Sequence, residues 1–385
     1  MKSEWTKKKL SDIADFNPRE TVKKGAIAKK IPMDVLRPFY RDIPYYVEEC
    51  FSGGTKFRNG DTIMARITPC LENGKTAQVS ILNDGEVGFG STEYIVFRAK
   101  EGIADKDYLY YLVCSPEVRE PAIKSMVGSS GRQRVQTDVV KNLEIDVPPL
   151  VEQEKIGSFL KAFDDKIALN DKINKNLELQ AAALFTNFYD QAETEIGFTE
   201  IIQILGGGTP KTGESSYWNG DIPFFTPKDV GSPYTLTTEK TITEEGLAHC
   251  NSRLYPINTV FVTARGTVGK VSLPGVPMAM NQSCYALVDK DTPQLLVYFY
   301  TLKAVDRLKH KASGAVFDAI TTRDFEAENI MKLSNDDTKA FLDVAEPIYQ
   351  AVLNNSIENL RLAELRDSLL PKLMSGEIDV SNIQL

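Results

Sequence analysis

The segment GTPKTGES, which begins at Gly208, is the first stretch of this 385-residue chain to consider as a site of chemistry. It has the glycine spacing of a phosphate-binding loop, but Glu214 stands where such a loop needs a lysine to hold the phosphates. Farther upstream, PCLENGK begins at Pro69 and offers Glu72 and Lys75, yet no Pro-Asp pair precedes them where a PD-(D/E)xK nuclease needs one. We therefore predict neither a nucleotide-hydrolysing site nor a nuclease site here.

Histidine and cysteine, the usual residues of metal centres and covalent catalysis, are few and scattered in this sequence. The two histidines are His249 and His310, and the five cysteines form no Cys-x-x-Cys pair. The Asn-Pro-Pro-Tyr and Asp-Pro-Pro-Tyr motifs of amino methylation are missing as well. We expect no catalytic residue, no metal site and no cofactor in this chain.

Basic and amide side chains in loops are better candidates for a functional site, namely for DNA contacts. Arginine can form two hydrogen bonds with guanine, and asparagine or glutamine can do the same with adenine. The net charge of −8 argues against a uniformly basic surface, but it leaves room for local clusters such as GSSGRQR. In that segment small residues allow a close approach and three long donors follow. The predicted DNA contacts are Arg66, Lys75, Arg132, Gln133 and Arg134 in the first half of the chain, and Lys211, Lys228, Arg265, Lys270 and Lys309 in the second.

Each of these candidates has a structural alternative. Arg66 and Arg265 lie in strand-like runs, where an arginine can instead brace the fold by pairing with a carboxylate. GTPKTGES can be a plain surface turn, and GSSGRQR a solvated charged loop. Asp34 and Asp229, at similar places in the two halves, are more typical of turn or capping residues than of base readers.

The elements that would position these residues occur twice. Residues 1–147 and 197–334 each mix short strand-like runs with Gly and Asn turns and a helical stretch, which predicts two α+β domains. GDTIMARITPCLENGK matches NTVFVTARGTVGK, so that Arg66 falls opposite Arg265 and Lys75 opposite Lys270. GSSGRQRVQTDVVKNLEI similarly matches ASGAVFDAITTRDFEAENI.

A long helix is predicted after each domain, at residues 148–190 and 335–380. Side chains spaced by three and four form one stripe on each helix, and the two stripes are related by a constant offset of 185 residues, as from Ile156 to Phe341. Pro347 is expected to start or kink the second helix and Gly376 to end it. The residues predicted to pair the helices are Ile156, Leu160, Phe163, Ile167, Asn170, Asn174, Leu177, Ile348, Val352, Asn355, Asn359 and Leu362.

Either stripe alone could be ordinary core packing. Because both helices carry two asparagines at equivalent places, we expect them instead to pack against each other, antiparallel, about a pseudo-twofold axis. The fold class is thus α+β, with two β-rich domains joined by two long antiparallel helices. Such a repeat suits a molecule that does two equivalent jobs at a fixed separation.

Three segments resemble the specificity subunit of Type I restriction-modification systems. They are VPPLVEQEKI at the first domain-to-helix junction, ILGGGTPKTGESSYWNGDIPFFTPKDV at the start of the second domain, and ENLRLAELRDSLLPKLMSGEI near the C-terminus. The resemblance covers essentially the whole chain, although the opening of the first domain, LSDIADFNPRE to IPMDVL, is more divergent.

This resemblance implies two target recognition domains that each read one half of a split, asymmetric sequence in double-stranded DNA, with the helices acting as a ruler. It also implies two methyltransferase subunits that bind S-adenosylmethionine, and motor-nuclease subunits that complete the complex. The specificity subunit itself performs no chemistry. The apolar runs are too short to cross a membrane, and we expect a cytoplasmic protein.

Two other functions stay open at this point. The chain could be a self-contained DNA methyltransferase or nuclease with a helical dimerisation arm, against which the missing motifs count. It could also be a structural scaffold whose duplicated domains bind protein, against which the basic loops count.

Overall fold

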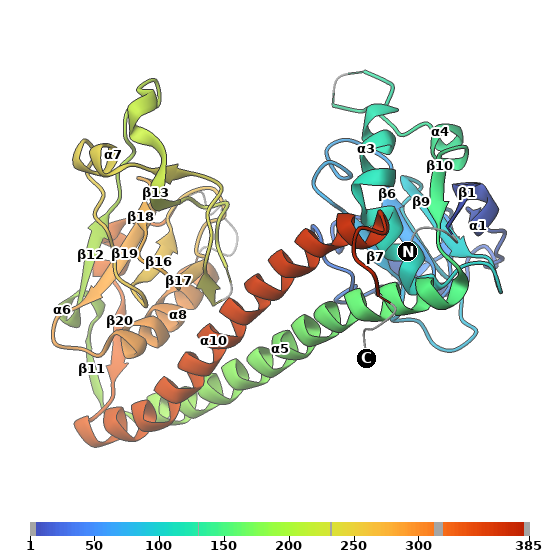
Figure 1. The fold of residues 1–385 in the computed structure, drawn as a ribbon. Coiled ribbons are helices and arrows are strands. Elements are labelled where there is room, and N and C mark those ends of the chain that lie inside the picture. The colour runs from blue at the N-terminus through green and yellow to red at the C-terminus, as the bar shows by residue number, and fades with distance from the viewer. Residues whose placement is uncertain (1–4, 130, 232, 312–318, 381–385) are drawn as a thin grey trace. The chain divides into compact units, whose positions relative to one another are not determined.

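The computed structural model describes residues 5–129, 131–231, 233–311 and 319–380. The chain divides into two compact units (Figure 1). Unit 1 comprises Met1–Leu169 together with Asn359–Leu385, and unit 2 comprises Asn170–Glu358. Both long helices, α5 (Leu150–Gln191) and α10 (Asn335–Met374), run through these boundaries, so each helix contributes one part to each unit.

Unit 1 holds its strands in two four-stranded sheets and one two-stranded ribbon. The strands are β1 (Thr6–Lys9), β2 (Ala14–Phe16), β3 (Ile27–Ile31), β4 (Val47–Cys50), β5 (Thr55–Phe57), β6 (Thr62–Ala65), β7 (Thr76–Gln78), β8 (Gly88–Gly90), β9 (Tyr94–Ala99) and β10 (Glu144–Val147). The shorter helices are α1 (Leu10–Ile13), α2 (Lys106–Cys114), α3 (Pro116–Lys124) and α4 (Thr137–Lys141). The sheet orders are β2-β9-β6-β7, β4-β3-β8-β5 and β1-β10.

The burial of side chains along these strands depends on which elements pack against each strand. All four residues of β6 are buried, which fits a central strand that has a neighbour on each side and α2 packed against it. In β10 the burial alternates, so Ile145 and Val147 reach the core while Glu144 and Asp146 face outward. The core of unit 1 joins α2 to Leu10 and Phe97 of the first domain and to the long helices.

Unit 2 repeats this order of elements. Its strands are β11 (Thr194–Gly197), β12 (Ile202–Gly206), β13 (Trp218–Phe225), β14 (Tyr234–Thr235), β15 (Thr241–Ile242), β16 (Val260–Thr263), β17 (Val271–Pro274), β18 (Ala279–Met280), β19 (Cys284–Asp289) and β20 (Asn329–Lys332). The shorter helices are α6 (Phe198–Ile201), the 3₁₀ turn Ser215–Tyr217, α7 (Glu244–Ala248), α8 (Gln294–Lys311) and α9 (Thr322–Glu326). The sheet orders are β12-β19-β16-β17-β14, β15-β13-β18 and β11-β20.

The strand pairings confirm the α+β fold and the internal repeat. The order β2-β9-β6-β7 in unit 1 returns as β12-β19-β16-β17 in unit 2. In the second sheet of each unit, β3 pairs with β8 in parallel, and β13 pairs with β18 in parallel. The ribbons β1-β10 and β11-β20 are both antiparallel and lead directly into α5 and α10.

The ends of the long helices follow local chemistry. Helix α5 begins after Pro148 and Pro149, and the carbonyl of Pro149 accepts hydrogen bonds from the amides of the first turn. At the end of α10, Gly376 adopts a φ of 67°, and it ends the helix as predicted. The prediction that Pro347 could start α10 is wrong, because the helix begins at Asn335 and runs through Pro347.

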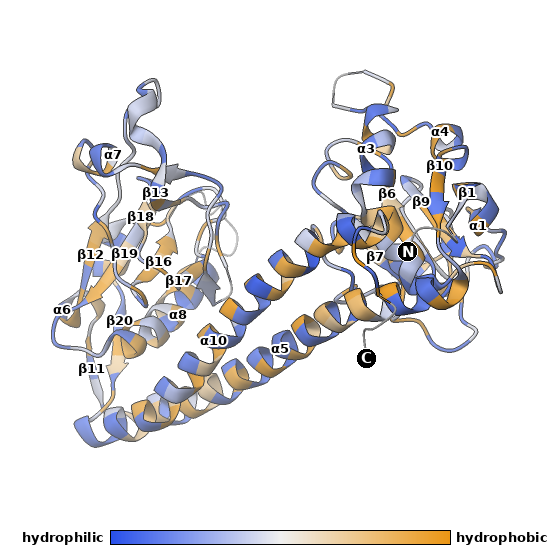
Figure 2. Ribbon diagram, in the orientation of Figure 1, coloured by the Kyte–Doolittle hydropathy of each residue, from blue (hydrophilic) through white to orange (hydrophobic). Residues whose placement is uncertain are grey.

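The two long helices run antiparallel within each unit. In unit 1, Asp164 of α5 contacts Arg366 of α10, while Ile156, earlier in α5, shares a core with Leu373, later in α10. Polar and apolar residues alternate along both helices (Figure 2), and the buried ones include seven of the twelve predicted pairing residues.

Unit 2 shows the same antiparallel relation. Asn355 donates a hydrogen bond of 2.8 Å to Asn174, and the rings of Phe185 and Phe341 lie 5.5 Å apart. Each unit therefore packs its own half of the helix pair into its own core. No described helix combines the length and the apolar character that a membrane crossing needs.

Candidate nucleic-acid interface

Loops from several strands of unit 2 contact one another at the β16–β17 turn. The amide of Arg265 donates to the carbonyl of Ser283, just before β19, at 3.3 Å. The hydroxyl of Thr267 donates to the carbonyl of Pro227, after β13, at 3.1 Å. These bonds hold the turn against its neighbours and leave the side chain of Arg265 exposed.

Two predicted lysines come together beside this turn. Gly269 has a φ of 71°, and a Cβ added there would meet Cε of Lys309 at 2.6 Å, so the lysine stem lies across the glycine. Burial and the neighbouring charge of Lys270 lower the pKa of Lys309, although Asp306 opposes this. Lys270 and Lys309 therefore form a site where two cations repel each other and an anion would be favoured.

The remaining predicted cations of unit 2 lie on loops that reach the same region. Thr209 donates a hydrogen bond to Gln282, which places the GTPKTGES loop beside the start of β19. Lys211 is exposed on that loop, and its backbone carbonyl accepts a bond of 3.2 Å from the indole of Trp218. Lys228 forms an exposed ion pair of 3.6 Å with Glu239, and such pairs contribute little to stability.

Asp229 contributes to the turn rather than to the surface. Its carboxylate accepts hydrogen bonds from the amide and hydroxyl of Thr226, and from the amide of Glu239 at 2.8 Å. This agrees with the prediction of a turn or capping residue.

Three predicted DNA contacts of unit 1 form hydrogen bonds with other groups of the protein. Arg66 donates to the carbonyl of Val135 at 3.1 Å, and Lys75 donates to that of Met33 at 2.9 Å. Arg134 makes bonds of 2.7–3.0 Å to the carboxylate of Glu93, which lower the pKa of that carboxyl. Arg66 is thus held by a backbone carbonyl and not by the carboxylate that the bracing alternative named, whereas Arg265, its equivalent in unit 2, is exposed.

Arg132 and Gln133 lie on a loop that closes at the bridge between Val127 and Arg134. The backbone of Gln133 is fixed by two hydrogen bonds of 3.0 Å with Thr68 on the β6–β7 loop. Arg132 is exposed, and its guanidinium has no partner among the described residues, which leave out position 130. The matching ASGAVFD segment of the second domain lies outside the described residues.

Sequence reasoning missed Arg19, an exposed arginine on the loop after β2. This loop and the β4–β5 turn border an open groove of 440 Å³ that is also lined by Lys56. Asn17 fixes the loop through two bonds to the backbone of Val96, at 2.8 and 3.0 Å. The order of elements was the available signal, because this loop follows β2 as the GTPKTGES loop follows β12.

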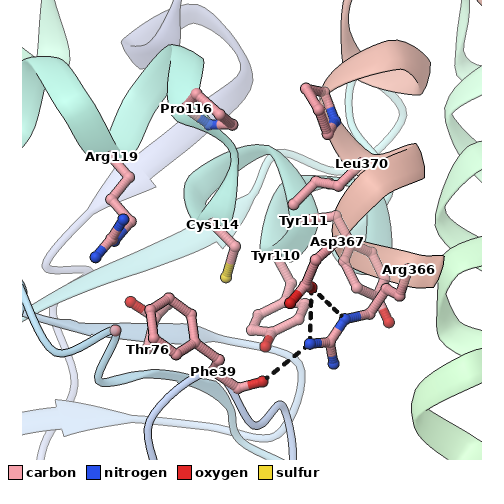
Figure 3. Close-up of a pocket in the computed structure, with 12 residues that line it drawn as sticks. Phe39, Thr76, Tyr110, Tyr111, Cys114, Pro116, Arg119, Arg366, Asp367 and Leu370 are labelled. Atoms are coloured by element: carbon pink, nitrogen blue, oxygen red, sulfur yellow. Dashed lines mark hydrogen bonds and ion pairs between the residues drawn. The ribbon is translucent and has the colours of Figure 1, made fainter. Parts of the chain in front are cut away.

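The largely apolar cavity in unit 1 does not have the chemistry of an active site. Its volume is 210 Å³, and Figure 3 shows Phe39, Tyr110, Cys114 and Leu370 around it. Burial raises the pKa of the Cys114 thiol to about 12, so the thiolate needed for nucleophilic attack is disfavoured. Within the part of the chain that the structure describes, no three His, Cys, Asp or Glu side chains gather as metal ligands.

The predicted helix-pairing residues are all buried or half-buried on α5 and α10. The buried ones are Ile156, Leu160, Ile167, Asn170, Asn174, Val352 and Asn359, and the half-buried ones are Phe163, Leu177, Ile348, Asn355 and Leu362. Asn170 donates to Glu358 at 2.7 Å, and the amide of Asn174 reaches the carbonyl of Val352 at 3.5 Å.

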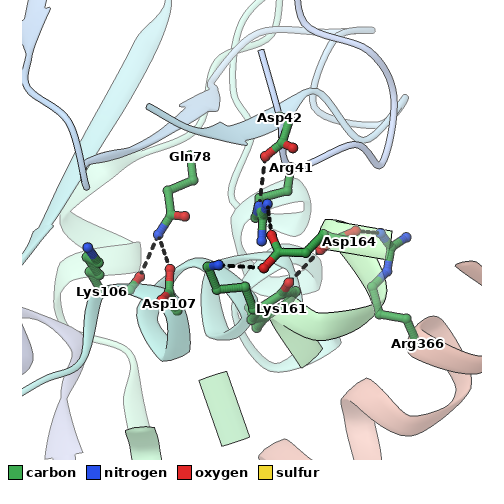
Figure 4. Close-up of polar contacts among 10 residues, drawn as sticks. Arg41, Asp42, Gln78, Lys106, Asp107, Lys161, Asp164 and Arg366 are labelled. Carbon is green, nitrogen blue, oxygen red and sulfur yellow. Dashed lines mark hydrogen bonds and ion pairs between the residues drawn. The ribbon is translucent and has the colours of Figure 1, made fainter. Parts of the chain in front are cut away.

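The same stripe includes a buried ion pair that sequence reasoning missed. Asp164 and Arg366 are paired side chains with 6% and 8% exposure, and Figure 4 shows them with the nearby Arg41. Burial opposes the charge of Arg366, but Asp164 and Asp367 outweigh it and keep the pKa of the guanidinium above its usual value. Both residues have the helical spacing of buried positions, but a search for apolar residues at that spacing does not include charged ones.

Comparison with known proteins identifies a family. A family model described as the Type I restriction modification DNA specificity domain matches residues 2–179 and 194–332. The specificity subunit of the Type I restriction enzyme HindI from Haemophilus influenzae is 23% identical over 468 aligned residues, which cover 98% of this chain and 100% of the relative. That of EcoAI from Escherichia coli is 35% identical over 158 residues, or 40% of this chain and 26% of the relative.

Solved structures show a similar fold. The crystal structure of the Type I restriction-modification system S subunit from M. genitalium aligns with a TM-score of 0.58 at 15% identity. The alignment covers 96% of each chain, so the likeness includes both domains and both long helices.

Proposed function

Because the chain belongs to the family of Type I restriction-modification DNA specificity subunits, we propose that each of its two heads reads one half of a bipartite, asymmetric site in double-stranded DNA. The heads are residues 1–147 and 197–334. In this proposal the chain itself makes and breaks no covalent bond.

One observation carries the proposal: the heads share a strand order and differ in the availability of their basic side chains. In unit 2, Arg265 and Lys270 are exposed on the β16–β17 turn. In unit 1, their equivalents Arg66 and Lys75 donate to backbone carbonyls. Two heads of one architecture with different donors in reach suit two half-sites of different sequence.

The long helices are proposed to set the distance between the half-sites. Helices α5 and α10 contain 42 and 40 residues. At about 1.5 Å per residue, helices of this length reach roughly 60 Å, so inserting or removing turns would change the spacer in discrete steps.

We further propose that the helices dock two methyltransferase subunits. Both helices keep large apolar side chains in solvent, including Val151 at 67% exposure, Leu179 at 55% and Leu365 at 48%. Covering such side chains with a partner protein would remove apolar surface from water, which is favourable. S-adenosylmethionine is expected on those partner subunits, which would supply adenine-N6 methylation, and motor-nuclease subunits would complete the restriction complex.

Methylation mapping tests the proposal directly. The chain is co-expressed with its cognate methyltransferase subunit, and N6-methyladenine is mapped across the host genome. We expect one split motif with a fixed gap, which disappears when this chain is deleted and the methyltransferase is kept. Methylation that does not change on deletion would refute the assignment.

A further inference from the structure

Asp164 and Arg366 form a buried ion pair between α5 and α10, whereas the other polar contacts described between these helices involve the asparagines and Glu358. Tyr111 donates its hydroxyl to Asp164, and Arg366 also donates to the carbonyl of Phe39 at 3.3 Å. Arg41 is held nearby by a bond of 2.6 Å to Asp165 (Figure 4). The pair is therefore built into the core of unit 1 by the helices and by the head.

The repeat shows what occupies the same two places in unit 2. At the offset of 185 residues, Asp164 corresponds to Tyr349, and Arg366 corresponds to Ala181. Both are buried, and the ring of Tyr349 lies 5.6 Å from the rings of Tyr298 and Phe299. At the position where unit 1 holds two opposite charges, unit 2 thus has aromatic contacts.

The asparagines do not differ in this way. At the same offset Asn170 corresponds to Asn355, and Asn174 to Asn359, so both helices carry identical residues in these two layers. The observed bond from Asn355 to Asn174 could be reproduced by Asn170 of a second copy. The bond between these asparagines would therefore form in α5 against another α5 as it does in α5 against α10, whereas the bond from Asn170 to Glu358 would be lost, because Glu358 corresponds to Ile173.

The ion pair of Asp164 and Arg366 would disfavour both arrangements in which a helix pairs with a second copy of itself. If α5 paired with a second α5, Asp164 would face Ala181 of the other copy and lose Arg366, keeping nearby only Arg41, which is itself paired with Asp42 and Asp165. If α10 paired with a second α10, Arg366 would face Tyr349 and lose its buried partner Asp164, keeping only its neighbour Asp367, whose side chain is 53% exposed. A buried charge left without its partner is strongly unfavourable, whereas the observed pairing of α5 with α10 satisfies both charges.

We propose that Asp164 and Arg366 select the partner of each helix, making α5 pair with α10 and preventing either half of the repeat from pairing with a copy of itself. Tyr111 positions the carboxylate for this selection. The inference concerns helix pairing alone and does not depend on DNA recognition, so its failure would leave the proposed function untouched.

A nicked form of the whole protein tests the selection. A protease site is inserted after Ala192, between the end of α5 and the start of β11, and the folded chain is cleaved there. Isotopically labelled and unlabelled preparations are mixed, and native mass spectrometry counts the pairs once the halves have exchanged. We expect nicked wild-type protein to contain first-half with second-half pairs, in at least tenfold excess over like-with-like pairs.

The decisive variant combines Asp164→Leu with Arg366→Met. An apolar pair of similar volume usually preserves stability, and it removes the opposite charges that are proposed to select the partner helix. We expect the excess of unlike pairs to fall at least tenfold. Asp164→Asn with Arg366→Gln, which removes the charges at nearly constant shape, should lower it in the same direction. Lys339→Ala, which breaks an exposed pair with Asp343 on α10, is the matched control and should leave the ratio unchanged.

The outcomes separate selection from mere packing. If both double variants keep the wild-type ratio, the ion pair contributes only to packing and the proposal is overturned. Like-with-like pairs in wild type at the level of unlike pairs would overturn it as well.

Discussion

Lys270 and Lys309 offer the sharpest test of the DNA interface. Their charges lie close enough that Lys270 adds to the effect of burial in lowering the pKa of Lys309. In the free protein this repulsion is unfavourable, and a DNA phosphate between the two cations would relieve it. We therefore expect Lys270→Ala and Lys309→Ala to weaken DNA binding without lowering the stability of the free protein.

The magnitude follows from counterion release. Each phosphate contact contributes about 0.9 to the slope of log K against log salt concentration, which is roughly eightfold in affinity at about 0.1 M salt. Loss of one lysine should reduce the slope by about 0.9, and loss of both should reduce it by about 1.8 and the affinity roughly 60-fold. Because phosphates carry no sequence information, the loss should be similar for cognate and unrelated DNA.

The assay is fluorescence anisotropy of labelled DNA with the specificity subunit bound to its methyltransferase partners, over a series of salt concentrations. Lys339→Ala, on the exposed face of α10, removes the same charge elsewhere and serves as the control. An unchanged slope in the double variant would contradict the reasoning, as would a loss confined to the cognate sequence. A thermal melt of the free chain checks that the variants are folded.

Three further predictions concern the heads and the helix ends. Replacing residues 197–334 with the corresponding head of another family member should change one half of the methylated motif, and a change in both halves would argue against two independent heads. Glu20→Gln should cost about 1.5 kcal/mol at neutral pH, because hydrogen bonds from Arg58 outweigh burial and, with Arg98, lower the pKa of this carboxyl. That contribution is complete above the unfolded pKa of about 4.3 and is lost as pH falls through the lower folded value, so urea unfolding of wild type and variant should converge in acid. Gly376→Ala should cost about 1–2 kcal/mol in the same assay because its φ is 67°, whereas Gly213→Ala, where an added Cβ meets nothing within 4 Å, should be nearly neutral.

The helices and the repeat were predictable because they depend on local patterns. A residue's place on a helix stripe follows from its spacing, and the two stripes follow one another at a constant offset from Ile156 and Phe341 onward. Gly376 was recognisable as a helix end because a left-handed residue after the last turn is usually glycine. Pro347 does not start α10, because the helix begins at Asn335 and Pro347 is its thirteenth residue; the position of a proline alone does not show whether it starts a helix or lies inside one.

The buried ion pair was beyond the reach of the same reasoning. Asp164 and Arg366 are separated by 202 positions, and neither is buried favourably without the other. A pattern that looks for apolar residues passes over both. Once the antiparallel pairing is known, the offset identifies their counterparts, Tyr349 and Ala181, and the asymmetry becomes visible.

The sequence by itself determined the duplicated α+β heads, the two long helices and the family, because each of these depends on residue types and spacing along the chain. The tertiary structure decided which basic side chains are available. Arg66 and Arg265 align in sequence, yet Arg66 donates to Val135 while Arg265 is exposed. The physical reason is that a side chain's freedom depends on which distant loops supply an acceptor, and the spacing of residues along the chain does not record those contacts.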